Sequence, residues 1–342
     1  MSNTQINYEL CDSASQWEAA MELFPESNFL QSWAWGDFQK KMGKTVTRLL
    51  FVSKNKTVGL AQLIREPARR GTYAAIAGGP LLDWNNTSLL KSVFESLRHE
   101  AQKLGCTFIR FRPQATIDQV SPAILKKLGA VEAPMHLTAD LTIEIDLTKD
   151  PEQLLSEMRK QHRQAIKKAT ALGIEVHQSQ NADDLRDFYQ AQVELAQRHG
   201  FVPFSYKFLL EQFKTFVAND QVVLFHAYLG SKLLASAFVI FYHGTAVYHY
   251  GISTAENQSY PGSYACQWAI IQEAQRRQCT SYNLWGVSPK DDTNHRFYGV
   301  GLFKRGFGGT EVAYVPAQDV PLQPTYWLTW LFELARKKFR HL

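Results

Sequence analysis

The sequence predicts a mixed α/β protein made of two similar units in tandem, and three observations lead to that prediction. A chain of 342 residues is longer than a single hydrophobic core usually supports. Strand-like and helix-like segments alternate through both halves. The two halves also match in order, because EAQKLGCT at 100–107 recurs as EAQRRQCT at 273–280, and the Leu-Ala pair at 60–61 recurs at 234–235. Such nearly constant offsets indicate a tandem duplication.

The same succession of elements is expected in each half. Strands are predicted at 47–54, 56–64, 73–79 and 108–113, and again at 222–230, 231–240, 246–253 and 282–287. The segment before the last strand of each half has helical spacing of its apolar residues: Leu89, Leu90, Val93, Phe94 and Leu97 in the first half, and Ala265, Trp268, Ile271 and Ala274 in the second. This order predicts mixed sheets with helices on their faces.

Composition excludes several classes of protein. Hydrophobic residues make up 45% and charged residues 20%, which is typical of an ordinary globular protein. The net charge of +5 is too small to indicate nucleic-acid binding by itself, although a local basic surface can still hold phosphate. The four cysteines are far apart, which argues against structural zinc and a disulfide framework. The N-terminus lacks a signal-peptide pattern and no apolar segment is long enough to span a membrane, so we expect a cytoplasmic protein.

A basic helix is predicted between the two halves. Asp150 and Pro151 form a helix start, and Leu154, Leu155, Met158, Ala165, Ile166 and Ala169 would form its buried stripe. Arg159, Arg163 and Lys167 recur every four residues, with Lys168 beside them. This ridge is either a solvated face or a surface that binds nucleic acid.

The C-terminal segment TYWLTWLFELARKKFRHL also has a helical pattern. Trp327, Trp330, Leu331 and Leu334 fall on one side, and a basic tail follows. We expect this helix to dock on the first unit, and contact with an anionic membrane surface is the alternative.

An unusual lysine occurs near the end of the second half. Lys304 follows Phe303 and precedes a turn containing Gly306, Gly308 and Gly309. Such a lysine is either solvated in a tight turn or partly desolvated and facing a negative group.

Several segments, taken in order, resemble the FemABX family of aminoacyl-tRNA-dependent peptidyltransferases, which build peptidoglycan cross-bridges. They are Phe29–Trp35, Gly79–Asp83, Asp146-Leu147 with the basic helix around Arg163, Ala196–Phe201, Tyr260–Trp268, Tyr282–Val287 and Gly299–Gly309. The resemblance spans nearly the whole chain and is closest to the compact, FemX-like members. It implies two tandem GNAT-like (acyl-CoA N-acyltransferase-like) domains without a coiled-coil arm.

The resemblance also implies functions for these domains. Residues 1–147 with about 318–342 would form the acceptor domain, and 148–317 the catalytic, donor-binding domain. The expected activity is transfer of an amino acid from aminoacyl-tRNA to an amine of a peptidoglycan precursor. The tRNA is a co-substrate, and no cofactor or metal is expected. The protein would be a cytoplasmic monomer, with possible peripheral contact with the inner membrane surface.

Site residues follow from the same resemblance. Lys304, with Phe303, would stabilise the oxyanion of the tetrahedral intermediate. The expected substrate-binding residues are Trp35, Lys40, Arg112, Tyr260 and Tyr264, and the expected tRNA-binding residues are Arg159, Arg163, Lys167 and Lys168.

Three positions depart from the family pattern. Gln39 and Phe204 stand where members often have a lysine and an arginine that hold acceptor phosphate, and Arg112 stands where some have an aspartate proposed as a base. These departures favour a lipid-linked precursor over a nucleotide-linked one, with Arg112 as an alternative phosphate contact, and they favour proton transfer assisted by the substrate.

Two other functions remain open. The segment Arg296–Gly301 matches the RxxGxG pattern with which acyl-CoA-dependent GNAT enzymes bind pyrophosphate, but it follows the wrong strand. A non-enzymatic protein that binds RNA or a membrane is the second alternative.

Overall fold

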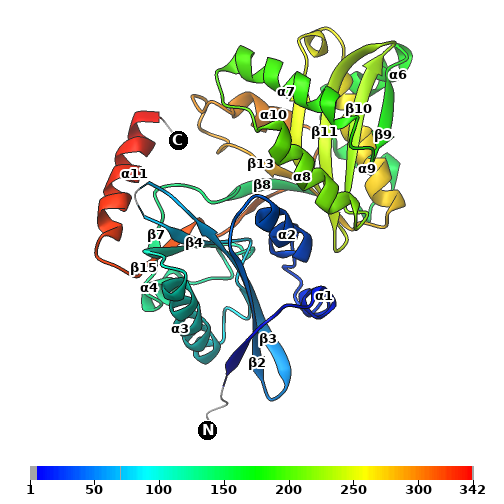
Figure 1. Ribbon diagram of the computed structural model, residues 1–342. Coiled ribbons are helices and arrows are strands. Elements are labelled where there is room, and N and C mark those ends of the chain that lie inside the picture. The colour runs from blue at the N-terminus through cyan, green and yellow to red at the C-terminus, as the bar shows by residue number, and fades with distance from the viewer. Residues whose placement is uncertain (1–5, 70, 341–342) are drawn as a thin grey trace. The chain divides into compact units, whose positions relative to one another are not determined.

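The structure, a computed structural model, describes residues 6–69 and 71–340 and divides into two compact units (Figure 1). Unit 1 comprises the chain up to residue 140 together with residues from 313 onward, and unit 2 comprises residues 141–312. The predicted boundaries at 147 and about 318 are therefore displaced. The reason is strand pairing, because residues 141–146 hydrogen-bond to the sheet of unit 2.

Unit 1 is a mixed sheet with helices. Its strands are β1 (Asn7–Leu10), β2 (Val46–Ser53), β3 (Lys56–Glu66), β4 (Tyr73–Ala77), β5 (Leu81–Leu82), β6 (Phe108–Arg112), β7 (Val131–Glu132) and β15 (Gln318–Pro321). Its helices are α1 (Ala14–Met21), α2 (Trp33–Lys41), α3 (Thr87–Lys103), α4 (Pro122–Lys127) and α11 (Tyr326–Arg340), with a short 3-10 helix at Phe29–Gln31. The strand order is β1-β2-β3-β4-β6-β15-β7, with β5 beside β3, and the β4–β6 pair is parallel.

Unit 2 repeats this arrangement. Its strands are β8 (Leu141–Asp146), β9 (Glu175–Ser179), β10 (Val222–Leu229), β11 (Lys232–Tyr242), β12 (Thr245–Ser253), β13 (Ser281–Gly286) and β14 (Thr310–Ala313). Its helices are α5 (Pro151–Glu157), α6 (Lys160–Ala171), α7 (Leu185–His199), α8 (Tyr206–Val217), α9 (Gly262–Arg276) and α10 (Tyr298–Arg305), with a 3-10 helix at Glu256–Gln258. The order is β14-β8-β13-β12-β11-β10-β9, and the β12–β13 pair is parallel.

The duplicated sequence segments occupy matching places in the two units. In each, the copied glutamate is buried near the end of a helix, Glu100 in α3 and Glu273 in α9. The copied cysteine follows, and its N–H closes the helix end on the carbonyl of the alanine five residues earlier. In each sheet the strand next to one edge comes from a distant segment of the chain. This strand is β15, between β6 and β7, in unit 1, and β8, between β13 and β14, in unit 2. The repeat is thus structural as well as sequential.

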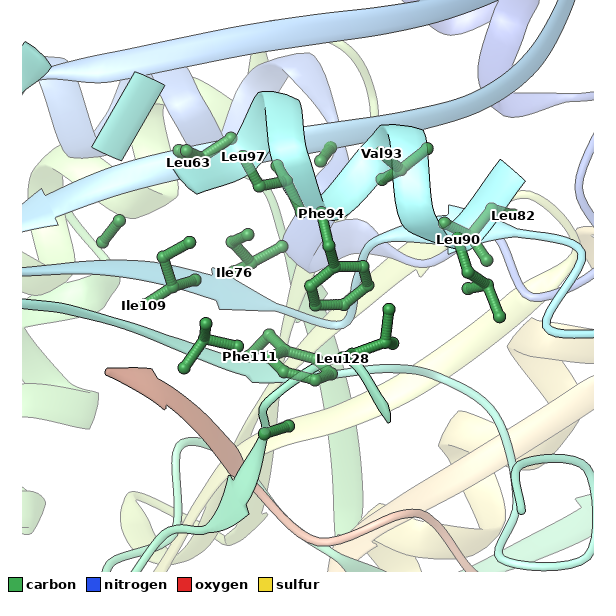
Figure 2. Packing of buried hydrophobic residues seen from close by; sticks show 14 of the residues in the cluster. Leu63, Ile76, Leu82, Leu90, Val93, Phe94, Leu97, Ile109, Phe111 and Leu128 are labelled. Atoms are coloured by element: carbon green, nitrogen blue, oxygen red, sulfur yellow. The ribbon is translucent and has the colours of Figure 1, made fainter. Parts of the chain in front are cut away.

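The core of unit 1 lies between its sheet and α3 (Figure 2). Asn86 caps the start of α3, because its side chain accepts a hydrogen bond from the N–H of Leu89. The predicted apolar stripe of this helix is buried. Phe94 reaches from α3 onto Phe111 of β6, with ring centroids 5.1 Å apart in an edge-on contact.

A buried ion network attaches the C-terminal segment to unit 1. Arg110 of β6 forms two hydrogen bonds of 2.7 Å to Asp319 of β15 and one of 2.7 Å to Glu333 of α11. The hydroxyl of Tyr326 donates to Asp319 at 3.0 Å. Since Asp319 is fully buried, these contacts fix both β15 and the start of α11 on the sheet.

Candidate active site

The parallel strands β12 and β13 separate partway along the sheet of unit 2. They pair over Thr245–Val247 and Ser281–Asn283, whereas β12 continues to Ser253 and β13 to Gly286. Their outer edges remain paired, β12 with β11 up to Ser253 and β13 with Thr142 of β8 at Gly286. We call this place the β12–β13 divergence. On its inner edges the two strands do not hydrogen-bond to each other, so backbone groups there take other partners, such as Lys304 at Gly286.

Lys304, in the last turn of α10, occupies the β12–β13 divergence. It is 7% exposed, and its Nζ donates a 2.8 Å hydrogen bond to the carbonyl oxygen of Gly286 at the end of β13. The same Nζ lies 5.7 Å from the ring centroid of Tyr248 on β12. Lys304 therefore touches both strands, and the interpretation of a solvated turn lysine is wrong.

Burial lowers the pKa of Lys304 from its usual value to about 7, because desolvation penalises the charged ammonium. Within the described part of the chain, no carboxylate forms an ion pair with this nitrogen. An ammonium has three N–H donors, and one of them is used by Gly286. The remaining donors can stabilise negative charge that develops next to Lys304.

His162 of α6 fixes the helix that carries Lys304. Its Nε2 lies 2.9 Å from the carbonyl oxygen of Phe303, and because a carbonyl only accepts, Nε2 carries the proton. The imidazole is buried and lies directly on Gly306, where a Cβ atom would be 1.8 Å from a ring carbon. Glycine at 306 is therefore required by this close approach, and the helix end is held in one position.

Aromatic side chains surround the same helix end. Phe303 packs edge-on against Tyr264 of α9 and Phe307, with ring centroids 5.2 and 5.0 Å apart. The His162 ring contacts Tyr264 at 5.0 Å and Phe307 at 4.7 Å. Burial raises the pKa of Tyr264, so its hydroxyl stays protonated at neutral pH. Two predicted site residues, Phe303 and Tyr264, are thus brought together beside Lys304.

The backbone on the β13 side of the divergence is held in an uncommon conformation. Trp285 has φ of 63°, a region that bulky residues rarely adopt. Its N–H donates to the side chain of Asn283 at 2.8 Å, and its carbonyl accepts from the hydroxyl of Thr142 at 3.0 Å. Its ring meets His249 of β12 edge-on at 5.5 Å. These contacts determine where the next carbonyl, that of Gly286, is directed.

Gly309, in the turn after Lys304, also has a packing explanation. Gly309 has φ of 83°, and a Cβ atom there would lie 2.5 Å from the carbonyl oxygen of Glu144 in β8. A side chain at 309 would therefore displace the chain from β8. Gly306 and Gly309, which follow Lys304 at the C-terminal end of α10, therefore both permit close packing.

The loop 254–261 connects β12 to α9 and contains Tyr260, one of the predicted substrate-binding residues. Asn257 accepts a 2.8 Å hydrogen bond from the N–H of Ser263 in the first turn of α9. Tyr260 is half-buried in this loop, and its N–H bonds the carbonyl of Glu256. Among the described contacts, Tyr260 does not join the aromatic cluster that holds Tyr264. Its predicted substrate contact stays a prediction.

The predicted basic helix is two helices. α5 ends at Glu157 and α6 begins at Lys160, because Met158 between them has extended backbone with ψ of 150°. The N–H of Arg159 bonds the carbonyl of Gly306 at 2.9 Å, which ties this break to the lysine helix. The single continuous buried stripe is therefore wrong.

One of the predicted tRNA-binding residues, Arg163, also has a structural partner at this break. Arg163 is partly buried, and its Nη1 donates to the carbonyls of Ser156 and Met158 at the end of α5. This nitrogen closes a helix end, and contact of Arg163 with tRNA stays a prediction. Arg159, Lys167 and Lys168 are exposed, and their role in binding tRNA stays a prediction.

In unit 1, the prediction that Arg112 contacts phosphate is wrong. Arg112 is 1% exposed, and burial lowers its pKa to about 10. Its guanidinium donates to Thr138, to the carbonyl of Pro113 and to Gln114, and lies over the ring of Tyr314. It holds chain segments of unit 1 together and has no surface to offer a phosphate.

The other predicted acceptor residues lie on or near α2. Trp35 is partly buried against Phe29 and Phe38, with ring centroids 5.6 and 5.4 Å apart. Lys40 is exposed at the end of the helix, and the neighbouring Gln39 is 4% exposed. Their contact with substrate stays a prediction. In unit 2, Phe204 stacks on Phe208 at 5.0 Å, so it does not replace a phosphate clamp.

Sequence reasoning missed the partners of Lys304. Tyr248 is one of several aromatic residues in an alternating strand, and the Gly286 carbonyl is a backbone group that carries no side-chain signal. The link from His162 to the backbone of Phe303 also has no signal in the sequence. The RxxGxG match at Arg296–Gly301 lies before and within the start of α10, and the β12–α9 loop contains no such pattern.

Comparisons with known proteins agree with this architecture. The sequence profile described as the FemAB family matches residues 15–126, 127–233 and 220–333. The UDP-N-acetylmuramoylpentapeptide-lysine N(6)-alanyltransferase of Weissella viridescens is 26% identical over 262 residues, which cover 72% of this chain and 75% of that protein. The lipid II:glycine glycyltransferase of Staphylococcus saprophyticus is 19% identical, covering 85% of this chain and 87% of that protein.

Solved structures confirm the predicted fold. The crystal structure of FemX superposes with a TM-score of 0.85 at 17% identity and covers 96% of this chain and 100% of its own. A tandem GNAT protein from the clavulanic acid biosynthesis pathway has a TM-score of 0.59 at 12% identity, covering 94% and 99%. The prediction of tandem GNAT-like domains is thus confirmed. The family match extends over most of the sequence, and the chain belongs to the FemAB family.

Proposed function

We propose that this protein is an aminoacyltransferase that moves an amino acid from aminoacyl-tRNA to an amine of a peptidoglycan precursor. Family membership supports the class of reaction. The alanyltransferase and glycyltransferase relatives, by their names, act on a muropeptide and on lipid II. The observation that carries the proposal is the buried Lys304 in the β12–β13 divergence.

The reaction needs stabilisation of negative charge at one oxygen. The acceptor amine attacks the ester carbonyl of the aminoacyl-tRNA, which forms a C–N bond and a tetrahedral intermediate with an oxyanion. Collapse breaks the C–O bond, and the ribose hydroxyl leaves with the proton that the amine gives up. Lys304 donates hydrogen bonds to the oxyanion, and a positioned donor of this kind in a dry site contributes about 3 kcal/mol to catalysis.

The low pKa of Lys304 suits this role. In the free protein the ammonium has a carbonyl and an aromatic face as partners, and its pKa is about 7. An oxyanion beside it raises that pKa, so the charged form is favoured when the intermediate forms. Interaction is then stronger in the transition state than in the ground state, which is the condition for rate acceleration.

The acceptor we propose is a lipid-linked precursor. Gln39 is buried and Phe204 is stacked on a neighbouring ring, so neither replaces a phosphate clamp for a nucleotide-linked acceptor. For the donor, the exposed Arg159, Lys167 and Lys168 on and beside α6 are the proposed contacts with tRNA phosphates. We propose that the enzyme acts as a monomer on the cytoplasmic side of the inner membrane.

One assay tests this function. The purified protein is incubated with a pool of charged tRNAs and with either lipid-linked or nucleotide-linked precursor, and the product is weighed by mass spectrometry. We expect a mass increase of one or more amino-acid residues on the lipid-linked acceptor. A gain with acetyl-CoA and a simple amine, and none with either precursor, would reject the proposal in favour of an acyl-CoA-dependent enzyme.

A further inference from the structure

The C-terminal helix α11 is drawn in red in Figure 1, and most of its large apolar side chains are exposed. Its inner side is formed by Tyr326, which is buried, by Thr329, and by Glu333, which binds Arg110. The indole N–H of Trp330 donates to the carbonyl of Glu132. The predicted docking stripe of Trp327, Trp330, Leu331 and Leu334 is therefore largely wrong, because polar as well as aromatic groups make the attachment.

The outer side of α11 carries a continuous apolar surface. Five large side chains are exposed by at least a third: Trp327 47%, Leu328 72%, Leu331 57%, Phe332 39% and Phe339 86%. Their spacing of three, four and seven residues places them on one side over the length of the helix. A globular protein rarely leaves such a stripe to water, so this surface, which we call the α11 face, indicates a binding partner.

The charges of α11 indicate what that partner is. Glu333 is the single acidic residue in the sequence of the helix, and it is paired with Arg110 on the inner side. Arg336 and Lys338 are exposed near the apolar stripe, and Lys337 is half-buried. An apolar stripe bordered by basic side chains, on a helix whose one acidic residue is paired, is complementary to a bilayer surface rich in anionic lipid.

We propose that the α11 face binds the surface of an anionic membrane. The helix would lie in the plane of the bilayer, with Leu328 and Leu331 among the acyl chains and Lys338 among the headgroups. Among the described helices, none is long and apolar enough to cross a membrane. This inference rests on the proposed function for its purpose, because a membrane-bound enzyme meets a lipid-linked acceptor where that acceptor resides.

Vesicle co-sedimentation tests the proposal. The full chain is mixed with vesicles of phosphatidylcholine, and with vesicles that also contain phosphatidylglycerol, at low and high salt. We expect binding to the anionic vesicles, weaker binding at high salt, and little binding to the neutral ones. The double variant Leu328→Glu/Leu331→Glu should bind at least about tenfold more weakly, since each change removes a large apolar side chain from the contact.

A matched control is available on the same unit. Leu23 is 60% exposed, similar to Leu331, but lies after α1 and away from α11 in the sequence. Leu23→Glu should leave vesicle binding unchanged. Equal binding by the double variant and the wild type would overturn the proposal. So would a wild-type dimer in sedimentation equilibrium that the double variant dissociates, since a second copy would then cover the α11 face.

Transfer assays separate this inference from the proposed function. With a water-soluble acceptor the double variant should keep wild-type activity, and with lipid-linked acceptor in vesicles it should lose activity. A wild-type protein that binds anionic vesicles but transfers no amino acid to any acceptor would reject the proposed function and leave the membrane contact standing. Active protein that ignores vesicles would reject the membrane contact alone.

Discussion

The two sheets share a strand order but differ at one pair of parallel strands. In unit 1, β4 and β6 pair along their whole length, from Tyr73 with Phe108 to Ala77 with Arg112. In unit 2, β12 and β13 pair over three positions and then separate. A fully paired strand edge has no free backbone groups, whereas a separated pair exposes them to a side chain from elsewhere. Of the two copies of the fold, the one in unit 2 therefore has a strand pair that can receive a side chain, here Lys304.

The two units also differ in how a buried cation is compensated. Arg110 in unit 1 is surrounded by Asp319 and Glu333, and these carboxylates hold its pKa above the usual value. Lys304 in unit 2 is buried as deeply but has no carboxylate partner among the described residues, and its pKa falls to about 7. A compensated charge holds the fold together, while an uncompensated one remains available for a substrate. Five predictions test this difference.

The largest effect is expected from breaking the compensated pair. Asp319→Ala leaves the buried Arg110 with a partner on one side, so we expect the free energy of unfolding to fall by about 3–5 kcal/mol. Chemical denaturation measures the change. Glu66→Ala removes the half-exposed Lys44–Glu66 pair and should cost less than about 1 kcal/mol. Similar losses in the two variants would remove the structural role that we assign to Arg110.

Removal of the uncompensated cation should act on the reaction. We expect Lys304→Ala to lower kcat by about 100-fold or more, with little change in KM for the acceptor. Lys232→Ala, at an exposed lysine of the same unit, is the control. Steady-state kinetics with the product measured by mass spectrometry gives both constants. A kcat within twofold of wild type would exclude Lys304 from the mechanism.

The packing of the C-terminal end of α10 on His162 can be tested with two glycines. Gly306→Ala drives a methyl group into the ring of His162, so we expect a loss of about 1–3 kcal/mol in stability together with lower kcat. Gly299→Ala in the same helix meets no atom within 4 Å and should stabilise the protein slightly. Thermal unfolding and kinetics distinguish the pair, and equal behaviour of the two variants would contradict the packing argument.

Charge reversal on α6 tests the proposed donor surface. Lys167→Glu/Lys168→Glu should weaken tRNA binding by about tenfold or more and reduce its dependence on salt. The exposed neighbours Lys126 and Lys127 on α4 of unit 1 offer a matched pair, and their reversal should have little effect. Binding is measured at several salt concentrations. Equal losses from both pairs would mean that the tRNA responds to overall charge.

The last prediction concerns pH. The folded pKa of Lys304 lies near 7 and the unfolded value is 10.5, so between these limits the unfolded chain binds the extra proton. Stability should therefore rise with pH in this window, by up to about 1.4 kcal/mol per unit from this group. Lys304→Met should lose that contribution. Urea denaturation at pH 7 and pH 9 measures it, and identical pH dependence in the two proteins would contradict the burial of a neutral lysine.

The sequence by itself determined the repeat and the fold class, and its local pattern distinguished Lys304 from the other lysines. Residues 100–107 and 273–280 match because each closes a helix against the same sheet position, and apolar spacing reports burial directly. The glycines after Lys304 predicted a turn, and the structure adds that Gly306 packs on His162 and Gly309 on Glu144. Patterns of this kind depend only on residues that are neighbours along the chain, so they can be recognised in the sequence alone.

Tertiary structure decided the environments of the candidate residues. Arg112 resembled a phosphate contact in sequence, yet Thr138 and Tyr314 enclose it, and Arg163 is turned to the end of α5. Lys304 contacts both strands because β12 and β13 separate, and its Gly286 partner is a backbone carbonyl. Burial, charge compensation and the outward direction of the α11 face depend on segments far apart in the chain, which no local pattern reports.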